Sequence, residues 1–496
     1  MKKLREHPYY LIMLPLFFVL HAFLENYGAI TLAETIIPAI IYAGGTFLVS
    51  LVFRFLYRSK TKAGIATLVV AAFFFFYTAI RDLLLQYPFT AFLARYRYLV
   101  PAFLLFFLVV FIYLGRSGKH HYGFTIFLNL VFMAIMLPDL VKLIYISASP
   151  DDHRLSVPEV RNSNSAACDT CYKPDIFLIV MDEYAGSASL KANYNFDNDL
   201  DSFLLARNFS IQSKSRSNYN YTVFSMTSLL NMNYIKGIDK RGIVEARHHS
   251  NCLRLIRSNQ VMKMLAKKGY ELANYSVFSL EDQQTEIDQT FVTAGTELIN
   301  GRTIIGLITA DWNRRRRTIS KEKMSDLIDL KPYRKSNKRF QQLLMQSARR
   351  QKKPRFVYAH FMMPHLPFYY DRHGNLNDLS RPSVISPDVH NEEFINNYLD
   401  YVLYTNARIR EMIDAIQQQN PKAVILLLGD HGFRPRNAPR ERFFENLNAV
   451  YYPDGDYSQL YDSITTVNQF RVFFNKFFDQ KLPLLDDSTI FIRNRR

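Results

Sequence analysis

The stretch Pro174–Gly186, PDIFLIVMDEYAG, decides the fold of the larger part of this chain. Its centre, Ile176–Met181, is an unbroken apolar run, which is typical of a strand buried on both faces of a parallel sheet. The run ends directly in two carboxylates, Asp182 and Glu183. In an open α/β sheet, ligands bind beside the carboxyl ends of the strands. This stretch therefore predicts a central strand and one edge of a functional site.

Two stretches further along the chain repeat this pattern of an apolar strand followed by ionisable side chains. In KPRFVYAHFMMPHLPF, the run FVYA predicts a strand, and His360 and His365 follow it. In AVILLLGDHG, the run AVILLL predicts a strand, and Asp430 and His431 follow it. Helical stretches separate these runs, which predicts an α/β domain with a mainly parallel central sheet. A lone Asp after a strand is usually a turn residue or a helix cap, but three such strand ends together favour a divalent-metal site.

The segment SKSRSNYNYTVFSMTSLL places a hydroxyl at the start of a predicted helix. Apolar residues recur with a helical period from Val223 to Leu230, so Thr222 lies at or just inside the helix N-terminus. Thr222 could be only an N-cap, and the local sequence alone favours that interpretation. The alternative is a nucleophile, because a helix N-terminus attracts phosphate and a bound metal ion would activate the hydroxyl oxygen.

Five apolar stretches precede this domain, and their lengths suit helices that cross a bilayer. The first is short and contains His21, and no cleavage pattern follows it, so we do not expect a cleaved signal peptide. The predicted spans are Tyr9–Glu25, Ile36–Leu56, Ala63–Leu85, Tyr98–Leu114 and Tyr122–Ile146.

Lys and Arg in the loops predict the orientation of these spans. Basic residues gather at the N-terminus and in the loops after the second and fourth spans, so we expect these segments in the cytoplasm. The loop after the third span departs from this pattern, because Arg81, Arg95 and Arg97 lie near it. The pair Arg81–Asp82 is most simply an interfacial ion pair, and a substrate contact is the alternative. Five crossings predict a multi-pass protein of the bacterial inner membrane whose larger domain is periplasmic or extracellular.

The net charge of +17 would suit either nucleic acid or an anionic membrane surface as a partner. The external location favours the membrane surface and excludes nucleic acid. A basic stretch over residues 310–353 is either a solvated surface or a face against anionic headgroups. Near the C-terminus, VNQFRVFFNKFF predicts an amphipathic helix followed by a basic tail, packed on the domain or on the membrane surface.

A polar segment over residues 148–172 predicts a linker, and it contains Cys168 and Cys171. No thioredoxin-like context surrounds this pair, so a linker disulfide or an incidental pair is favoured over a redox site. The predicted organisation is a transmembrane bundle (1–147), the linker (148–172), an extracytoplasmic catalytic domain (173–480) and a basic tail (481–496).

The order of four motifs, DIFLIVMDE, SxSNYxxTxxS, HxxxPHxPF and GDHG, resembles that of the alkaline-phosphatase superfamily. The chain is similar to its membrane-bound sulfatase-like members, such as phosphoethanolamine transferases and lipoteichoic acid synthase. Those proteins also have about five N-terminal spans and an external catalytic domain, so the resemblance covers nearly the whole chain. It implies an N-terminal all-α transmembrane bundle that is followed along the chain by an alkaline-phosphatase-like α/β domain.

The resemblance also implies roles for particular residues. Asp182, Asp430 and His431 match metal ligands, and Glu183 matches a second acidic residue found in sulfatases. Thr222 matches the metal-bound threonine nucleophile of the headgroup transferases. The transferases usually have Glu at the position of Asp182, and the C/S-x-P-x-R pattern of true sulfatases is absent around Thr222. The likeness to sulfatases is therefore one of fold.

His360 and His365 resemble histidines that contact the phosphate or a second metal ion, and either would act as a general acid. The expected metal is zinc or manganese rather than calcium. The implied reaction moves a phosphoethanolamine- or phosphoglycerol-type headgroup from a phospholipid through Thr222 to an envelope lipid or glycan. The alternatives are a hydrolase or phosphodiesterase on the same site, and an inactive membrane scaffold that binds envelope glycans.

Overall fold

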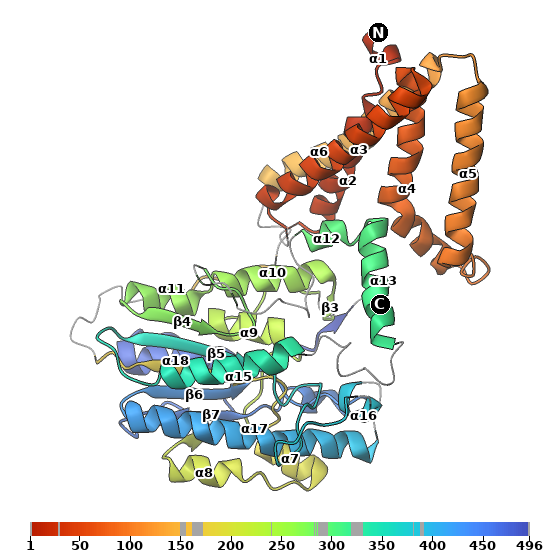
Figure 1. Ribbon diagram of the computed structural model, residues 1–496. Coiled ribbons are helices and arrows are strands. Elements are labelled where there is room, and N and C mark those ends of the chain that lie inside the picture. The colour runs from red at the N-terminus through yellow and green to blue at the C-terminus, as the bar shows by residue number, and fades with distance from the viewer. Residues whose placement is uncertain are drawn as a thin grey trace. The chain divides into compact units, whose positions relative to one another are not determined.

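The chain forms two compact units in the computed structural model (Figure 1). The first comprises Met1–Arg154 and Val292–Arg316, and the second comprises Leu155–Phe291 and Arg317–Arg496. The structure describes residues 2–27, 30–148, 155–160, 172–239, 241–281, 283, 285, 296–318, 331–379, 381–386 and 391–494. The sequence-based bounds 1–147, 148–172, 173–480 and 481–496 stay predictions, and they gave no sign that residues 292–316 would group with the N-terminal helices.

The first unit is helical, as the five apolar stretches predict. Four of its helices are long and apolar enough to cross a membrane, and the sixteen-residue α2 is the shorter apolar helix that precedes them. The helices are α1 (Lys2–Glu6), α2 (Tyr10–Glu25), α3 (Leu32–Tyr57), α4 (Lys60–Gln86), α5 (Tyr96–Arg116), α6 (Tyr122–Ala148), α12 (Glu297–Asn300) and α13 (Ile304–Thr318). Large apolar side chains on α3, α5 and α6 are exposed, as expected for helices that face lipid.

The three segments predicted to be cytoplasmic lie together at one end of this bundle. The Nζ of Lys60 lies 3.3 Å from Nε2 of His7, which joins the α3–α4 turn to the N-terminal segment. The Nζ of Lys62 donates to the carbonyl oxygen of Ser117, which joins the same turn to the α5–α6 loop. Because α4 has 27 residues and is about 40 Å long, the α4–α5 loop lies at the opposite end.

A segment from the middle of the chain packs on the N-terminal helices. The hydroxyl of Tyr42 donates to the side-chain oxygen of Asn300 at 2.6 Å. Ile304 and Leu307 are buried in a cluster with Tyr77 and Leu99. Helices α12 and α13 therefore belong to the first unit, although 137 residues of the second unit, Leu155–Phe291, precede them along the chain.

A six-stranded sheet with the order β2-β7-β6-β1-β5-β4 forms the centre of the second unit. Strands β4, β5, β1 and β6 are parallel, and β7 and β2 are antiparallel to their neighbours, so the mainly parallel sheet is confirmed. The central strand β1 is buried at every residue because β5 and β6 flank it. The strands are β1 (Ile176–Met181), β2 (Ser210–Ile211), β4 (Glu271–Tyr275), β5 (Arg355–Phe361), β6 (Val424–Gly429) and β7 (Asn448–Tyr451).

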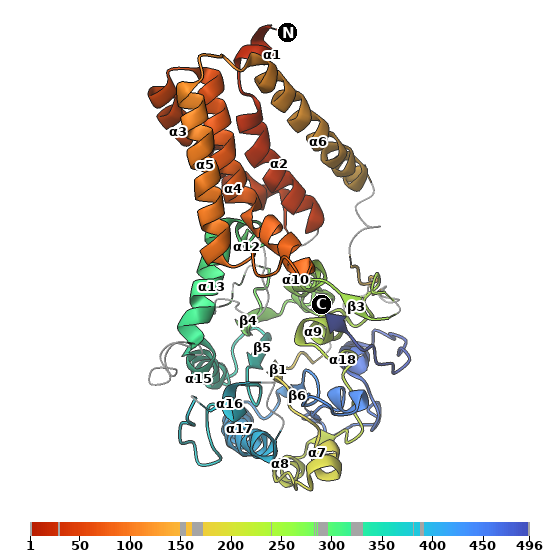
Figure 2. The same ribbon diagram turned by 90° about the vertical axis from the view of Figure 1, so that its right-hand side faces the viewer.

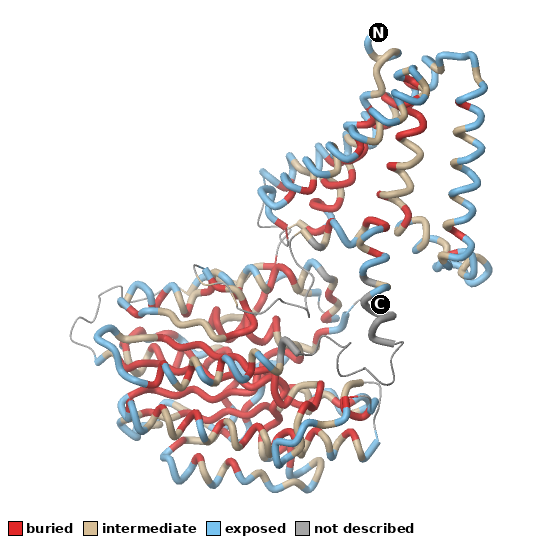
Figure 3. Tube along the Cα trace, in the orientation of Figure 1, coloured by how far each residue is buried: buried red, intermediate tan, exposed pale blue. Residues whose placement is uncertain are grey.

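Helices cover both faces of this sheet. Figure 2 shows α15 and α17 on one face and α9 and α18 on the other, and Figure 3 shows that the buried residues of this unit concentrate on the strands. The helices are α7 (Ser187–Tyr194), α8 (Leu200–Ala206), α9 (Thr222–Asn231), α10 (Ala246–Arg257), α11 (Gln260–Lys267), α15 (Lys331–Gln346), α16 (Pro382–Ile385), α17 (Glu392–Gln419) and α18 (Thr466–Phe478).

The C-terminal helix α18 is the helix predicted from VNQFRVFFNKFF, and of its two predicted positions it takes the one on the domain. Every residue from Thr466 to Phe474 is buried, so this part of the helix has no exposed face and packs inside the domain. The polar residues that suggested an exposed face are bonded inside the domain. Asn468 Nδ2 donates to the carbonyl of Leu485 at 2.8 Å, and Arg471 Nε donates to that of Met232 at 2.8 Å.

The chain after α18 returns to the domain. A short strand β8 (Arg493–Asn494) pairs in parallel with β3 (Ile243–Val244). The backbone N–H of Ile490 donates to the carbonyl of Asn218 at 2.8 Å. The predicted basic tail is thus packed, in its described part, beside the segment that leads into α9.

Parts of two further predictions lie outside the described residues. These are the cysteine pair Cys168 and Cys171 and the side chains of Arg314–Arg317 in the basic stretch. In the described part of the predicted linker, Ser156 and Lys236 exchange backbone hydrogen bonds at 3.3 and 2.8 Å, so this part packs on the second unit.

Candidate functional site

The predicted strand ends converge at the centre of the sheet. Asp182 follows β1 and Asp430 follows the neighbouring β6, and the parallel register that pairs Met181 with Gly429 places these two residues side by side. His360 pairs with Val180 in the register of β5 with β1. Because side chains alternate along a strand, residue 182 projects to the same face as residue 180. The two carboxylates and the imidazole therefore meet above β1.

Three side-chain atoms in this cluster are buried without a hydrogen-bond partner among the described residues. They are Oδ1 of Asp182, Oδ2 of Asp430 and Nε2 of His360. One ligand atom from each of these residues lies within 4.8 Å of the others. Buried polar atoms are nearly always hydrogen-bonded, and a buried charge is costly unless it is paired. Two carboxylate oxygens and one imidazole nitrogen that lack protein partners are a donor set that fits a divalent metal ion.

Two of the remaining side-chain atoms, Oδ1 of Asp430 and Nδ1 of His360, have partners in the protein. Asp430 Oδ1 accepts the backbone N–H of Glu183 at 2.8 Å and that of His431 at 2.9 Å, which leaves Oδ2 for another partner. Nδ1 of His360 lies 3.1 Å from the hydroxyl of Tyr358, two residues back on the same strand. Such outer contacts orient a ligand side chain and fix which of its atoms faces the ion.

Thr222 lies next to this cluster and is the first residue of α9. Tyr221 precedes it with extended backbone angles, so Tyr221 occupies the N-cap position and Thr222 is not the cap. The hydroxyl of Thr222 lies 3.3 Å from Nε2 of His431. Ser225, one turn further along α9, donates its hydroxyl to the carbonyl of Asp430 at 2.5 Å, which ties the helix to the end of β6. The nucleophile predicted from the sequence therefore lies beside the metal-type cluster.

His431 connects the hydroxyl to the carboxylates. Its Nε2 lies 3.3 Å from Asp430 Oδ2 and 3.8 Å from Asp182 Oδ1. Its Nδ1 lies 2.9 Å from the carbonyl oxygen of Gly432, which assigns the ring proton to Nδ1. The lone pair of Nε2 therefore faces Thr222 and both carboxylates.

Glu183 has a different environment from its neighbour Asp182. Its backbone has a φ of 63°, so the chain turns sharply at the end of β1. Its Oε1 accepts the backbone N–H of Arg434 at 3.0 Å and Nε of the same residue at 3.3 Å. The described metal-type group consists of Asp182, His360 and Asp430, so the assignment of Glu183 as a ligand stays a prediction.

Arg434 is a site residue for which the sequence predicted no role. Its Nη1 donates to the carbonyl of Asn220 at 3.0 Å, and its guanidinium lies 5.1 Å from the ring centre of Tyr221. With its bonds to Glu183, it joins the ends of β1 and β6 to the segment that precedes Thr222. The position of Arg434 three residues after His431 was the only sequence signal available.

His365 occupies the more open side of the site. Its side chain is 28% exposed, whereas those of His360 and His431 are fully buried. Its Nε2 lies 3.7 Å from Oε2 of Glu183. Of the predicted histidines, His360 joins the metal-type cluster and His365 remains free to meet a molecule entering from solvent.

The electrostatics of the cluster also suit a cation. Burial pushes the pKa of Asp182 upward, but the neighbouring imidazoles, that of His365 foremost, outweigh it and hold this pKa below its usual range. Burial and then the charge of Asp182 raise the pKa of Asp430 well above its ordinary value. Burial, followed by the charge of Arg434, lowers the pKa of His431, so its imidazole is neutral near pH 7. Only one of these two adjacent carboxylates is readily ionised. A bound cation would reduce the repulsion between them and favour the ionised form of both.

Comparison with known proteins gives one family match that covers more than half of the chain. The family described as Sulfatase matches residues 176–475, which run from the first residue of β1 into α18. No curated protein sequence matches the chain.

Solved structures that are similar to this chain include two periplasmic domains. One is the C-terminal periplasmic domain of EptC from Escherichia coli in complex with Zn (11% identity, 64% of this chain and 86% of that chain, TM-score 0.40). Another is the corresponding domain of phosphoethanolamine transferase EptC from Campylobacter jejuni (13% identity, 62% and 90%, TM-score 0.35). A third similar structure is the phosphonate monoester hydrolase of Silicibacter pomeroyi (12% identity, 64% and 75%, TM-score 0.39).

Proposed function

The chain belongs to the sulfatase family of the alkaline-phosphatase-like superfamily, and we propose that it is a membrane-bound phosphotransferase that uses Thr222 as its nucleophile. The family assignment supports an enzyme, either a transferase or a hydrolase. The proposed donor is a phospholipid with a phosphoethanolamine- or phosphoglycerol-type headgroup, and the proposed acceptor is an envelope lipid or glycan. The proposed location is the bacterial inner membrane, with the second unit on the periplasmic or extracellular side.

The observation that carries this proposal is the contact between Thr222 and His431. A hydroxyl at the first position of a ten-residue helix lies 3.3 Å from an imidazole nitrogen whose lone pair faces it. The first N–H groups of a helix have no partner inside the helix and favour an anion. A phosphoryl group at this helix end would therefore be adjacent to the hydroxyl that attacks it.

The donor set of Asp182, His360 and Asp430 would hold a zinc or manganese ion. Nε2 of His431 faces the Thr222 hydroxyl instead, so the assignment of His431 as a ligand stays a prediction. When bound, such an ion acts as a Lewis acid that lowers the pKa of a hydroxyl and offsets negative charge on phosphoryl oxygens. The buried partnerless atoms of this chain support a divalent cation, and the choice between zinc and manganese is part of the proposal.

The bond changes proposed for transfer use this chain's residues as follows. The Thr222 oxygen attacks phosphorus, and the bond from phosphorus to the glycerol oxygen of the lipid breaks. The hydroxyl proton leaves toward Nε2 of His431, and the partly exposed His365 donates a proton to the departing diacylglycerol oxygen. The acceptor hydroxyl then gives its proton to His365 and attacks the same phosphorus, the bond from phosphorus to Thr222 breaks, and His431 returns its proton to the Thr222 oxygen.

Hydrolysis is the second candidate, because water could replace the acceptor hydroxyl in the last step with no change in the site. The contact between Thr222 and His431 serves both reactions equally. An inactive scaffold that binds envelope glycans is the third candidate, and the intact set of nucleophile, base and ligands argues against it.

The test uses full-length protein purified in detergent and phospholipids labelled in the headgroup. We expect the wild type to release diacylglycerol from phosphatidylethanolamine or phosphatidylglycerol, and we expect Thr222→Ala to release none. The label would appear in a lipid or glycan adduct if the enzyme is a transferase, and as free phosphoethanolamine or glycerol phosphate if it is a hydrolase. Equal release by the two proteins would refute the threonine nucleophile.

A further inference from the structure

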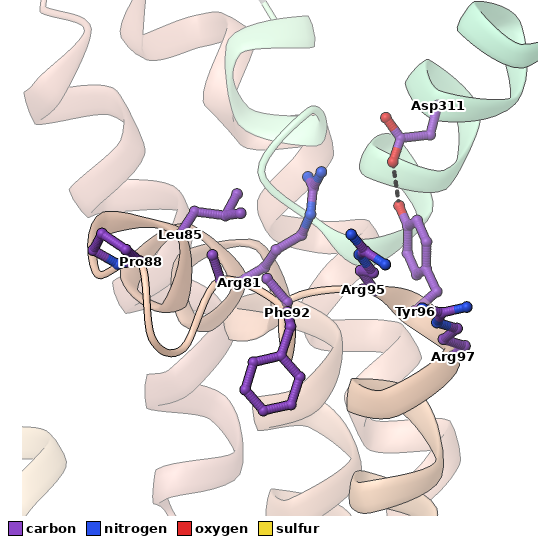
Figure 4. Close-up of a pocket in the computed structure, with 10 residues that line it drawn as sticks. Arg81, Leu85, Pro88, Phe92, Arg95, Tyr96, Arg97 and Asp311 are labelled. Atoms are coloured by element: carbon purple, nitrogen blue, oxygen red, sulfur yellow. Dashed lines mark hydrogen bonds between the residues drawn. The ribbon is translucent and has the colours of Figure 1, made fainter.

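The first unit contains a large cavity with a strongly basic lining (Figure 4). Its volume is about 1060 Å³, and its walls come from the end of α4, the α4–α5 loop, the start of α5 and one residue of α13. The lining residues are Arg81, Leu85, Pro88, Ala91, Phe92, Ala94, Arg95, Tyr96, Arg97 and Asp311. We call this cavity the arginine pocket.

The arginines of this pocket are the residues that depart from the distribution of Lys and Arg used to predict the orientation of the spans. The other basic loop segments lie at the opposite end, where Lys60 and Lys62 contact the N-terminal segment and the α5–α6 loop. The positive-inside bias disfavours Arg near external span ends. The three exceptions to this bias, Arg81, Arg95 and Arg97, line one cavity. This common location indicates that their positive charges have a function in the pocket.

The three guanidinium groups have no carboxylate partner among the described residues. Arg81 lies 5.9 Å from the ring centre of Tyr96, and Arg97 lies 4.8 Å from that of Tyr98. The one acidic lining residue, Asp311, accepts the hydroxyl of Tyr96 at 2.7 Å (Figure 4). The sequence suggested an ion pair between Arg81 and Asp82, but the described contacts contain none. Three guanidinium groups and one carboxylate leave the lining with net positive charge.

The pocket also has apolar lining residues, and its arginines lie near the ends of two helices that are long and apolar enough to cross a membrane. Arg81 is five residues before the end of α4, or about 8 Å along the helix, and Arg95 is the residue that precedes α5. Leu85 and Phe92 line the same cavity and are 48% and 54% exposed. Arginine recognises phosphate through paired, charge-assisted hydrogen bonds. A ligand that matches the whole lining has an anionic phosphate and apolar chains.

We propose that the arginine pocket binds a phospholipid of the outer leaflet, with its phosphate held by Arg81, Arg95 and Arg97 and its acyl chains against Leu85 and Phe92. None of its lining residues belongs to the strand-end site of the second unit. The proposal goes beyond the proposed function, because lipid binding here requires no turnover at Thr222.

The single tryptophan of the chain provides a direct readout. Trp312 follows the lining residue Asp311 on α13 and is 58% exposed. Bromine atoms on lipid chains quench tryptophan fluorescence at short range. We would titrate delipidated full-length protein in detergent with brominated phosphatidylglycerol, and we expect saturable quenching of Trp312.

Three comparisons distinguish a phospholipid site from an apolar surface that takes up any lipid chain. Brominated diacylglycerol has the same chains without phosphate, and we expect no saturable quenching by it. The triple variant Arg81→Gln/Arg95→Gln/Arg97→Gln should bind brominated phosphatidylglycerol at least about tenfold more weakly, since each charge-assisted bond contributes a factor of this order. Arg116→Gln, at the other end of α5, is the matched control and should bind like the wild type.

Several results would overturn the proposal. Equal quenching by brominated diacylglycerol and phosphatidylglycerol would show that the lipid phosphate is not recognised, and unchanged affinity in the triple variant would show that the arginines are not used. Displacement by an equal concentration of glycerol phosphate would show a site for free anions. If the triple variant does not fold, the exposed Arg97→Gln alone should still weaken binding. The readout needs no catalysis, so an inactive enzyme would leave this test unaffected.

Discussion

Nε2 of His431 lies 3.3 Å from the hydroxyl oxygen of Thr222, although 209 positions separate the two residues in the chain. The contact exists because β6 ends in the middle of the sheet and the N-terminus of α9 lies against that end, where Ser225 bonds to the carbonyl of Asp430. The chemistry and the stability of this site can both be measured on the full-length protein.

Substitution of the nucleophile should abolish turnover without loss of folding. Thr222→Ala removes the attacking oxygen, so we expect diacylglycerol release to fall by about 10³-fold or more, as when a nucleophile is removed from other enzymes. Thr222→Ser keeps the hydroxyl and should retain part of the activity. Ser258→Ala, which removes another hydroxyl of the second unit, serves as the matched control. Equal activity in Thr222→Ala and Thr222→Ser would contradict the prediction.

Metal binding should depend on the residues with partnerless atoms. Asp182→Asn, Asp430→Asn and His360→Gln should each lose bound metal as measured by elemental analysis. In the wild type, a hundredfold excess of free metal over its Kd should stabilise the folded state by about 2.7 kcal/mol, and a chelator should remove that increment.

Glu183→Gln tests whether Glu183 is a metal ligand or a partner of Arg434. If its contact with Arg434 is its main role, as the bonds at 3.0 and 3.3 Å indicate, this variant keeps the metal content of the wild type. A loss of metal equal to that of Asp182→Asn would instead make Glu183 a ligand, as the resemblance implies.

Removal of Arg434 should destabilise the second unit. Its side chain and that of Glu183 are 19% and 8% exposed, so Arg434→Met leaves a buried carboxylate without its partner. We expect a loss of about 3–5 kcal/mol in the free energy of unfolding, which is typical when one partner of a buried pair is removed. Urea unfolding followed by circular dichroism measures this loss. The exposed Lys352→Met should change stability by less than about 0.5 kcal/mol, and a similar change in both variants would refute the structural role of Arg434.

The thiol of Cys252 should be inert in the folded protein. Burial raises the pKa of Cys252 to about 12, and the reactive thiolate is therefore nearly absent at pH 8. Because the folded pKa is raised, the contribution of this thiol to stability is complete below about pH 8.5 and is lost as the pH rises toward 12. In a Cys168→Ser/Cys171→Ser background, maleimide at pH 8 should label the protein only in denaturant. Fast labelling of the native protein would show that the thiol is accessible.

The sequence allowed prediction of those parts of the fold that have a strong local signal. Strands β1 and β6 are continuous apolar runs, and the membrane helices are long apolar stretches, so each is visible in a short window. The strand ends carry Asp182 and Asp430, and the rule for open α/β sheets brings them together. The short strands β2 and β7 have no such run and were not predicted.

Other features depend on contacts between distant residues and leave no local pattern. Arg434 and Glu183 are 251 positions apart, and neither residue alone indicates a buried pair. The burial of α18 follows from hydrogen bonds of Asn468 and Arg471 to distant carbonyls, whereas the sequence shows only alternating polar and apolar residues. The cavity lined by three arginines likewise depends on distant contacts, because α13 supplies Asp311 to a lining that otherwise comes from α4, α5 and the loop between them.

The return of residues 292–316 to the N-terminal helices means that the chain passes between its two units three times. A protease site engineered into residues 148–172 would cut only the first of these passages. The two fragments should then stay associated in detergent, because α12 and α13 remain packed against α2, α4 and α5. For the same reason, a shortened protein that starts after residue 172 would carry an unpaired apolar helix face, and a soluble version of the second unit would need residues 292–316 replaced by a short polar connection.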